Sequence, residues 1–194
     1  MPSYAVIGCG GIGSYLAEHI KEMIDKEQLP LTDDYVLVDF DFVEPKNLLY
    51  QNFTEKDLGK NKAEVLAERY GFKFKNEKIA SEKQLEKYNR LIICADNTSV
   101  RELCYRYSIK TKKPLIDLRC QGRINTYLIF KKQKLKDLLE TLPENANSGS
   151  CQIEQRLENN QIDISNRIVA LKGIQLLLNI HRGIEVEEYA TENI

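Results

Sequence analysis

A glycine-rich turn near the start of the chain has the spacing of a phosphate-binding loop. The apolar run of residues 4–7 is followed by Gly8, Gly10, Gly11 and Gly13. Glycines at the first, third and sixth positions let such a turn bend tightly, approach a phosphate closely and pack the next helix against its strand. The free N–H groups at the start of that helix attract an anion. The pattern predicts a nucleotide site; the alternative is a turn that only joins a strand to a helix.

Acidic residues follow two later apolar runs. Asp39 and Asp41 close the run of residues 35–38, and Asp96 with Asn97 follows another run. A carboxylate at the end of the second strand of a nucleotide fold commonly accepts hydrogen bonds from ribose hydroxyls, which is the role expected for Asp39. Asp41, two residues on, is expected to share its strand face. The alternatives are a turn cap for Asp39, a loop-organising role for Asp41 and a helix N-cap for Asp96.

Lys62 is expected in the first turn of a helix, where a positive charge is unfavourable with respect to the helix dipole. The position is easier to explain if the ammonium reaches a phosphate group, and Lys60 is the second candidate for this role. The alternative for Lys62 is a surface lysine with a solvated ammonium. Asn47 and Gln51 lie four residues apart, so a short helix would point both amides in one direction.

Strands and helices alternate along the first 120 residues. Continuous apolar runs predict buried strands, and apolar residues at helical spacing predict helices between them. The expected strands are 4–7, 35–38, 72–79, 91–94 and 115–118, and the expected helices are 14–26, 61–70 and 98–108. This alternation predicts an α/β fold with a doubly wound, Rossmann-like, mostly parallel sheet and helices on both faces.

The rest of the chain is less regular. Polar and apolar residues roughly alternate over 123–130, which predicts a half-buried strand that joins the sheet antiparallel at one edge. A flexible loop is expected at about 141–160, and a long apolar-rich helix over 162–179. The acidic tail, 183–194, is expected to fray or to pair with a partner. No internal repeat is evident, so residues 1–194 are expected to form a single domain.

The composition is that of an ordinary globular protein. Of the 194 residues, 42% are hydrophobic and 29% are charged, with a net charge of −1. This balance offers no basic surface for nucleic acid or for an anionic membrane. No apolar run reaches the length of a membrane-spanning helix, and the first strand begins too early to leave room for a signal peptide. A cytoplasmic protein is therefore expected.

The five cysteines are odd in number and widely spaced, and none forms a Cys-x-x-Cys pair. This pattern favours thiols over a disulfide framework or a structural zinc site. Cys9, Cys94 and Cys104 are expected in the turn, a strand core and a helix, where they pack as small apolar side chains. His19 and His181 have no evident catalytic partner and are assigned no role in catalysis.

Five motifs follow one another in a recognisable order. They are Gly8–Gly13, Asp39–Glu44, Asn47–Gln51, Gly59–Lys62 and Asp96–Arg101. Together they resemble the ThiF/MoeB/HesA adenylyltransferases, relatives of the ubiquitin-activating enzymes, whose signature runs G-x-G-G-x-G, D-x-D-x-V-E, N-L-x-R-Q, Gly-x-x-Lys and D-N-x-x-x-R. The agreement spans residues 4 to about 101. The helix around 170–178, with Gln175, also resembles a later helix of the family.

The resemblance implies an ATP- and magnesium-dependent enzyme that adenylates the C-terminal carboxylate of a ubiquitin-like or sulfur-carrier protein and releases pyrophosphate. It further implies a substrate tail ending in Gly-Gly and a homodimer. Adenylation requires a fixed ribose, a neutralised triphosphate and a metal beside the leaving phosphate. The implied nucleotide-binding residues are Gly8, Gly10, Gly11, Gly13, Asp39, Asp41, Asn47, Gln51, Lys62, Asp96 and Asn97.

Four of these residues are implied to take part in catalysis. Asp96 would hold Mg²⁺, Lys62 would contact phosphate, and Asn47 and Gln51 would bind phosphate oxygens or the waters of the metal. Arg101, one turn into the helix after Asp96, is expected to be structural.

The sequence departs from the family at one charged position. Tyr50 stands where the N-L-x-R-Q motif has arginine, and a phenol supplies one hydrogen bond but no positive charge at neutral pH. Arg69, Arg119 or an arginine from a second subunit could compensate.

The family often adds a second step, in which a loop cysteine attacks the acyl adenylate to give a thioester or persulfide-linked intermediate. Cys151 follows the run Ser148–Ser150 and is the first candidate by position. Cys120 is the second. The alternative for Cys151 is a loop thiol without a chemical role.

Two other functions remain open at this point. A non-catalytic subunit that has kept the fold and pairs with an active partner would explain Tyr50. An oxidoreductase dependent on NAD(P) or flavin would explain the glycine turn and Asp39. The second alternative leaves Asn47, Lys62 and Asp96 without a role, and the fold alone does not choose among these functions.

Overall fold

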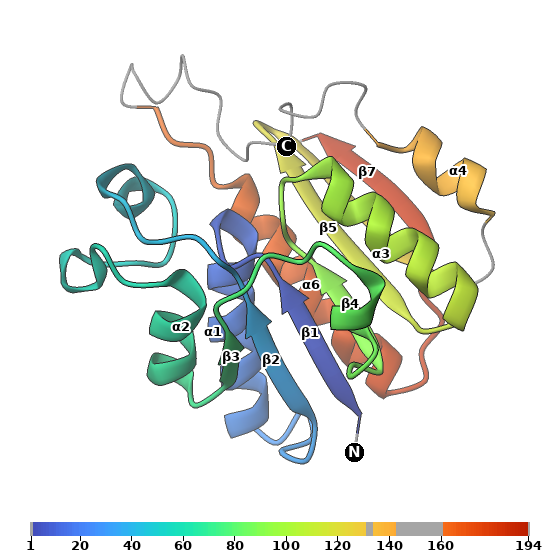
Figure 1. Cartoon of the computed structure of the whole chain (residues 1–194), viewed down its shortest axis with the longest axis horizontal. Helices are drawn as coiled ribbons and strands as arrows, with labels where there is room; N and C mark the ends of the chain where they lie inside the picture. Colours follow the sequence, from blue (N-terminus) through green and yellow to red (C-terminus); the bar gives the residue numbers. More distant parts are fainter. Residues whose placement is uncertain (1, 131–133, 143–160, 194) are drawn as a thin grey trace.

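The computed structural model describes residues 2–130, 134–142 and 161–193. Its strands form one seven-stranded sheet in the order β3-β2-β1-β4-β5-β6-β7 (Figure 1). They are β1 (Ser3–Ile7), β2 (Asp34–Val38), β3 (Lys73–Lys75), β4 (Arg90–Ile93), β5 (Leu115–Gln121), β6 (Ile124–Phe130) and β7 (Tyr189–Asn193). Strands β1 to β5 pair in parallel, whereas β6 and β7 pair antiparallel. The predicted doubly wound α/β fold with an antiparallel edge is therefore confirmed.

Helices pack on both faces of the sheet (Figure 1). The α-helices are α1 (Gly11–Asp25), α2 (Lys62–Tyr70), α3 (Thr98–Thr111), α4 (Leu135–Glu140) and α6 (Ser165–His181), and the 3₁₀ helices are η1 (Pro45–Leu49), η2 (Glu55–Asp57) and η3 (Glu82–Leu85). Helices α1, α2 and α6 bury their apolar side chains in one core, and α3, α4 and η3 bury theirs in a second core. Strand residues alternate between the two cores because successive side chains point to opposite faces.

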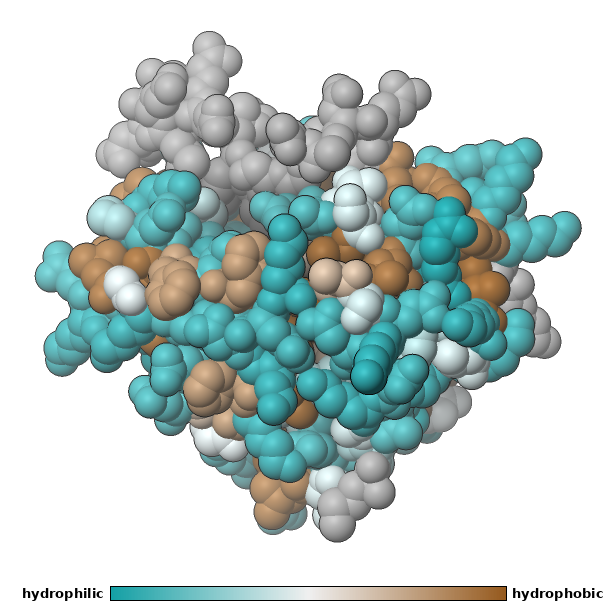
Figure 2. Space-filling view, in the orientation of Figure 1, coloured by the Kyte–Doolittle hydropathy of each residue, from teal (hydrophilic) through white to brown (hydrophobic). Residues whose placement is uncertain are grey.

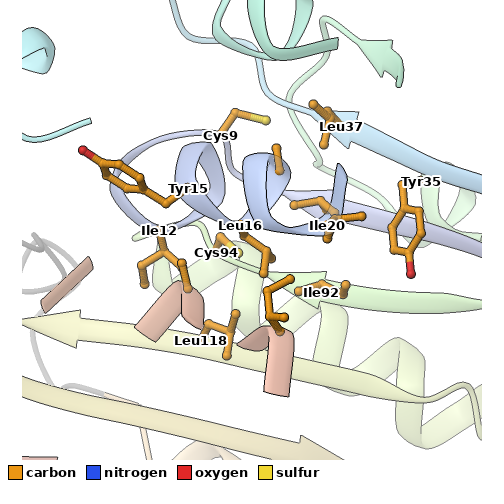
Figure 3. Packing of buried hydrophobic residues seen from close by; sticks show 14 of the residues in the cluster. Cys9, Ile12, Tyr15, Leu16, Ile20, Tyr35, Leu37, Ile92, Cys94 and Leu118 are labelled. Carbon is orange, nitrogen blue, oxygen red and sulfur yellow. The ribbon is translucent and has the colours of Figure 1, made fainter. Parts of the chain in front are cut away.

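Helix α1 lies at the centre of the first core, directly after the glycine turn. Ile12, Leu16 and Ile20 recur every four residues and are almost completely buried. Figure 3 shows Leu16 and Ile20 pointing from α1 toward Ile92 of β4. This spacing places one face of the helix against the sheet, and so holds the start of α1 beside the ends of β1 and β4.

The tail and one strand differ from the sequence-based predictions. Residues 189–193 do not fray but form β7, whose register with β6 runs from Leu128 opposite Tyr189 to Ile124 opposite Asn193. An ion pair from Lys172 of α6 to Glu192, 3.0 Å long, adds to this pairing. The strand expected over 72–79 contains only Lys73–Lys75. From Pro143 to Asn160 the predicted loop, with Cys151, lies outside the described residues.

The visible surface is mostly hydrophilic, as Figure 2 shows. Brown patches occur at the left, over the connection between β2 and α2 (Figures 1 and 2). This connection contains Phe42, Leu49 and Leu58, which are 53%, 48% and 40% exposed. None of the helices in the described ranges has the length and apolar character needed to cross a membrane.

Candidate active site

A pocket of about 190 Å³ opens at the carboxyl ends of the parallel strands. Its wall is formed by the glycine turn, the residues after β2 and β4, residues 50–51, the start of α2 and the loop after β3. The lining residues are Ile7, Gly8, Gly10, Gly11, Val38, Asp39, Phe40, Asp41, Tyr50, Gln51, Lys62, Glu77, Lys78, Ile79, Cys94, Ala95, Asp96, Asn97 and Val100. Strand β1 has β2 on one side and β4 on the other, so the chain changes direction in the sheet here. Such a switch point is where open α/β sheets bind ligands.

The glycine turn is shaped by two close backbone approaches. Gly8 has φ +94°, and a Cβ there would lie 2.6 Å from the backbone nitrogen of Ala95. A Cβ at Gly13 would lie 1.9 Å from the carbonyl oxygen of Gly8. The turn is therefore tight and α1 packs directly against it, as predicted. Because α1 begins at Gly11, its first N–H groups have no partner within the helix and lie beside the pocket.

Asp39 is anchored in the loop after β2. Its Oδ2 accepts a hydrogen bond from the Cys9 N–H at 2.6 Å, and its Oδ1 accepts one from the Asp41 N–H at 2.9 Å. The side chain is buried, and this burial raises the pKa of Asp39 while the two backbone N–H groups oppose the shift. Each carboxylate oxygen can accept a further hydrogen bond, so Asp39 retains the capacity to bind ribose hydroxyls.

The raised pKa of Asp39 predicts acid-sensitive nucleotide binding. Relative to the unfolded chain, the folded protein favours the protonated carboxyl of Asp39, so this contribution to stability is present at low pH and is lost as the pH rises through the raised pKa. Protonation also removes an acceptor for ribose. We therefore expect nucleotide affinity to fall during acidification at a pH above the ordinary aspartate pKa of about 3.9. Titrations between about pH 7 and pH 4 would test this prediction, and a constant affinity would contradict it.

Lys62 lies at the start of α2 and faces the pocket. Its side chain is only 9% exposed, and its Nζ lies 3.6 Å from Asp41 Oδ2. Asn61 caps α2 by accepting a hydrogen bond from the Glu64 N–H, and its Nδ2 lies within 3.1 Å of the Asp39 and Asp41 carbonyl oxygens. Asn61 therefore ties the helix that carries Lys62 to the loop that carries both acids. This role was not predicted, although an asparagine just before a helix is a common cap.

Asn47 and Gln51 lie one backbone turn apart, because the Gln51 N–H donates to the Asn47 carbonyl oxygen at 2.8 Å, but their side chains have different surroundings. The segment forms the 3₁₀ helix η1, which ends at Leu49. Asn47 is 2% exposed, and its Oδ1 accepts a hydrogen bond from the Glu44 N–H. Gln51 lines the pocket and Asn47 does not. The Gln51 Oε1 is buried without a hydrogen-bond partner, which leaves it available to a ligand.

Asp96 lies on the pocket wall after β4, and its side chain is exposed. The cap of α3 is Asn97, whose Oδ1 accepts a hydrogen bond from the Val100 N–H at 3.1 Å. The alternative of Asp96 as N-cap is therefore wrong. Arg101 is buried, pairs with Asp117 and donates to the Ala95 carbonyl oxygen. The predicted structural role of Arg101 is confirmed, because it fixes the backbone next to Asp96.

Replacement of Asn97 tests its role as the cap of α3. We expect Asn97→Ala to lower the free energy of unfolding by about 1 kcal/mol, because α3 loses its side-chain cap. Asn97→Asp should retain most of the stability, since a carboxylate caps equally well. Chemical denaturation of the two variants would test this prediction. Equal losses in both variants would contradict it.

Tyr50 lines the pocket, and neither proposed substitute arginine does. Arg69 pairs with Asp57 at 2.6 Å and lies outside the pocket wall. Arg119 also lies outside this wall and pairs with the buried Asp117 at 2.7 Å. Asn166 of α6 donates to the Tyr50 carbonyl oxygen and, at 3.4 Å, to that of Gly11. Asn166 was not predicted, because nothing in the sequence pairs the start of α6 with residues more than 100 positions away.

The described cysteines are all buried. Burial raises the pKa of Cys9 well above its usual range and that of Cys104 to about 12, so both thiols are protonated at neutral pH. Cys120, the second candidate nucleophile, is 4% exposed on β5 and does not line the pocket. Cys151 lies outside the described residues.

The wall contains further residues that the sequence analysis did not single out. Glu77, Lys78 and Ile79 follow β3, and Phe40 lies between the two acids after β2. Lys60, the second candidate for phosphate, is exposed and lies outside the wall. The positive charge of Lys78 does not mark it as a site residue in the sequence, because exposed lysines are common throughout this chain.

Fold and site together define an α/β protein with the architecture of a nucleotide-binding domain. A glycine turn, a strand-end carboxylate and a pocket at the switch point of the sheet are its characteristic features. The ThiF family model matches residues 2–193, and the chain belongs to the ThiF family.

Solved structures of E. coli MccB share this fold. The complex described as MccB with AMPCPP and MccA has a TM-score of 0.68 and 17% sequence identity, covering 99% of this chain and 63% of that one. The complex of MccB with ATP has a TM-score of 0.68 and 18% identity, with coverage of 99% and 64%. This chain thus spans less than two thirds of the MccB length. No curated protein matches the sequence.

Proposed function

We propose that this protein binds ATP in the pocket and transfers the adenylyl group to the C-terminal carboxylate of a peptide or small protein. One observation carries the proposal: the fold brings Asp39, Gln51, Lys62 and Asp96 together around the glycine turn. These residues span 58 positions of sequence, and each supplies a group that binding a magnesium nucleotide requires. Membership of the ThiF family supports the same reaction class.

The residues present fit ATP. The helix N-terminus and Lys62 would hold phosphate oxygens, and Asp39 would accept from the ribose hydroxyls. The Gln51 side chain lies near Gly10, 3.7 Å from the position of a Cβ there, and its Oε1 has no partner. The Gln51 Nε2 would donate to a phosphate oxygen in contact with the turn, and the unpaired Oε1 would accept a hydrogen bond from a water of the metal.

Asp96 would be the protein ligand of Mg²⁺. The described residues contain no group of three or more His, Cys, Asp or Glu side chains that could hold a metal ion. This fits Mg²⁺, which is commonly held by one or two carboxylates, with the other positions filled by substrate phosphates and water. The ion would neutralise charge on the phosphates. Arg101 donates a hydrogen bond to the Ala95 carbonyl oxygen. This bond would fix the backbone that presents Asp96 to the metal.

The proposed reaction needs no acid or base from the protein. A carboxylate oxygen of the partner attacks the α-phosphorus of ATP, and the bond from this phosphorus to the bridging oxygen breaks. Pyrophosphate leaves, and the product is an acyl adenylate. The residues of the pocket would act by positioning the reactants and by neutralising charge.

We further propose that the partner is a ubiquitin-like or sulfur-carrier protein with a C-terminal Gly-Gly and that the enzyme works as a homodimer. The apolar side chains exposed between β2 and α2 support contact with a polypeptide. Transfer to Cys151, giving a thioester or persulfide-linked intermediate, is the proposed second step. The MccB structures with MccA are consistent with a polypeptide partner for this fold.

The test is titration of the purified protein with ATP, with and without Mg²⁺, beside NADH. We expect binding of ATP that Mg²⁺ strengthens, and no binding of NADH. Lys62→Met should weaken ATP binding by at least about tenfold, because it removes a charge-assisted hydrogen bond. Lys60→Met is the matched control, since Lys60 is exposed outside the pocket wall. Binding of NADH in place of ATP would favour the oxidoreductase and refute adenylation.

Tyr50 favours a second candidate, a non-catalytic subunit that pairs with an active partner. The described pocket wall contains no arginine, so a subunit that binds ATP without using it is consistent with the site. Exchange of labelled pyrophosphate into ATP, measured with candidate carrier proteins, distinguishes the two functions. Exchange supports the enzyme, whereas ATP binding without exchange for any carrier supports the subunit.

A further inference from the structure

The pocket wall holds more negative than positive side chains. Its charged residues in the described chain are Asp39, Asp41, Glu77 and Asp96 against Lys62 and Lys78. A nucleoside triphosphate carries several negative charges, so binding against this wall requires cations in contact with the phosphates. Lys62 already has Asp41 at 3.6 Å. Lys78 is the other cation that the described wall offers.

The backbone at Lys78 is held on both sides while its side chain is exposed. The preceding residue, Glu77, pairs with Lys87 at 3.1 Å and accepts a hydrogen bond from Gln84 at 3.5 Å. The following residue, Ile79, is 4% exposed in the second core. The Lys78 backbone is therefore fixed at the pocket, while its flexible four-carbon side chain lets the ammonium move.

The ammonium of Lys78 lies over an aromatic ring, and it has no ion pair with a carboxylate of the described residues. Its Nζ is 5.4 Å from the centroid of the Phe40 ring. Phe40 is 46% exposed and also lines the pocket. A cation–π contact at such an exposed ring is weaker than a charge-assisted hydrogen bond to phosphate. The ammonium can therefore leave the ring when a stronger anionic partner enters the pocket.

We propose that Lys78 is a phosphate-binding residue, which rests on Phe40 in the free protein and moves to the phosphate oxygens of a bound nucleoside triphosphate. The inference rests on the proposed function, because it starts from a nucleotide in this pocket. It assigns the second positive charge of the site to the loop after β3. Adenosine, which has no phosphate, gains nothing from this residue.

The experiment is calorimetric titration of the full chain with Mg-ATP and with adenosine. Lys78→Gln should weaken Mg-ATP binding about tenfold, the effect of one charge-assisted hydrogen bond, and leave adenosine binding unchanged. Lys78→Arg should retain most of the Mg-ATP affinity. Lys75→Gln is the matched control, because it removes the same charge from an exposed residue three positions away that does not line the pocket.

Failure of the inference and failure of the proposed function give different results. If the wild-type protein binds Mg-ATP and Lys78→Gln binds it equally well, the inference is overturned and the proposed function stands. An equal loss of Mg-ATP and adenosine affinity would place Lys78 at the base or ribose and overturn its phosphate role. If the wild-type protein does not bind Mg-ATP, the proposed function fails and the inference falls with it.

Discussion

Gly13→Ala is expected to destabilise the protein by about 3 kcal/mol or more, at the upper end of the range for added volume in a packed site. Alanine is favoured over glycine in a helix by about 1 kcal/mol, so an ordinary helical glycine would show the opposite sign. Here the new Cβ would lie 1.9 Å from the Gly8 carbonyl oxygen. Neither atom can move alone, since the Gly8 oxygen belongs to the turn after β1 and the new Cβ would be fixed to the first turn of α1. Thermal and chemical denaturation would measure the loss.

Gly173→Ala is the comparison for this prediction. Gly173 is also inside a helix, and its new Cβ would lie 2.6 Å from Leu118 Cδ1. The obstacle is the end of a flexible side chain, so we expect a smaller loss of about 1 kcal/mol. If Gly13→Ala unfolds no more easily than Gly173→Ala, the glycine turn is not as rigid as its geometry indicates. Nucleotide affinity should fall in Gly13→Ala and remain in Gly173→Ala.

Asp96→Asn is expected to lower adenylation by about 100-fold, the effect commonly seen when an electrostatic group of an active site is removed. The amide keeps the size of the side chain but removes the charge that would hold Mg²⁺. Stability should change by less than about 0.5 kcal/mol, because the side chain is exposed and Asn97 caps α3. Pyrophosphate exchange and the effect of Mg²⁺ on ATP affinity are the two measurements.

Glu102→Gln is the control for Asp96→Asn. Glu102 lies in the first half of α3, pairs with Arg106 at 2.6 Å and does not line the pocket. Glu102→Gln removes one negative charge, as Asp96→Asn does, so a general change of the electrostatic potential would affect both variants. We expect Glu102→Gln to retain full exchange and the full effect of Mg²⁺. If Asp96→Asn behaves like Glu102→Gln, Asp96 is not the metal ligand.

Much of the candidate site could be predicted because its residues occupy defined places in a repeated strand-turn-helix pattern. Asp39, Lys62 and Asp96 each lie at the end of a strand or the start of a helix, and the carboxyl ends of parallel strands meet at one edge. All three line one pocket. Asn47 does not line this pocket, because its side chain is buried and accepts a hydrogen bond from the Glu44 N–H at the start of η1.

Other residues could be placed only by the folded structure. Asn166 reaches the carbonyl oxygens of Tyr50 and Gly11 because α6 packs beside α1. Lys78 lines the pocket although it lies three residues beyond the end of β3. The acidic tail becomes β7 because β6 offers an unpaired edge. No pattern of neighbouring residues in the sequence predicts any of these three contacts.

The sequence by itself determined the glycine turn, the alternation of strands and helices, and the types of side chain at the ends of the strands. These features depend on backbone preferences and on apolar spacing within a few residues. Tertiary structure decided which polar groups share the pocket, which edge the tail covers and which cations face a ligand. These outcomes depend on the packing of elements far apart in the chain, and a side chain acquires its partners only when that packing is complete.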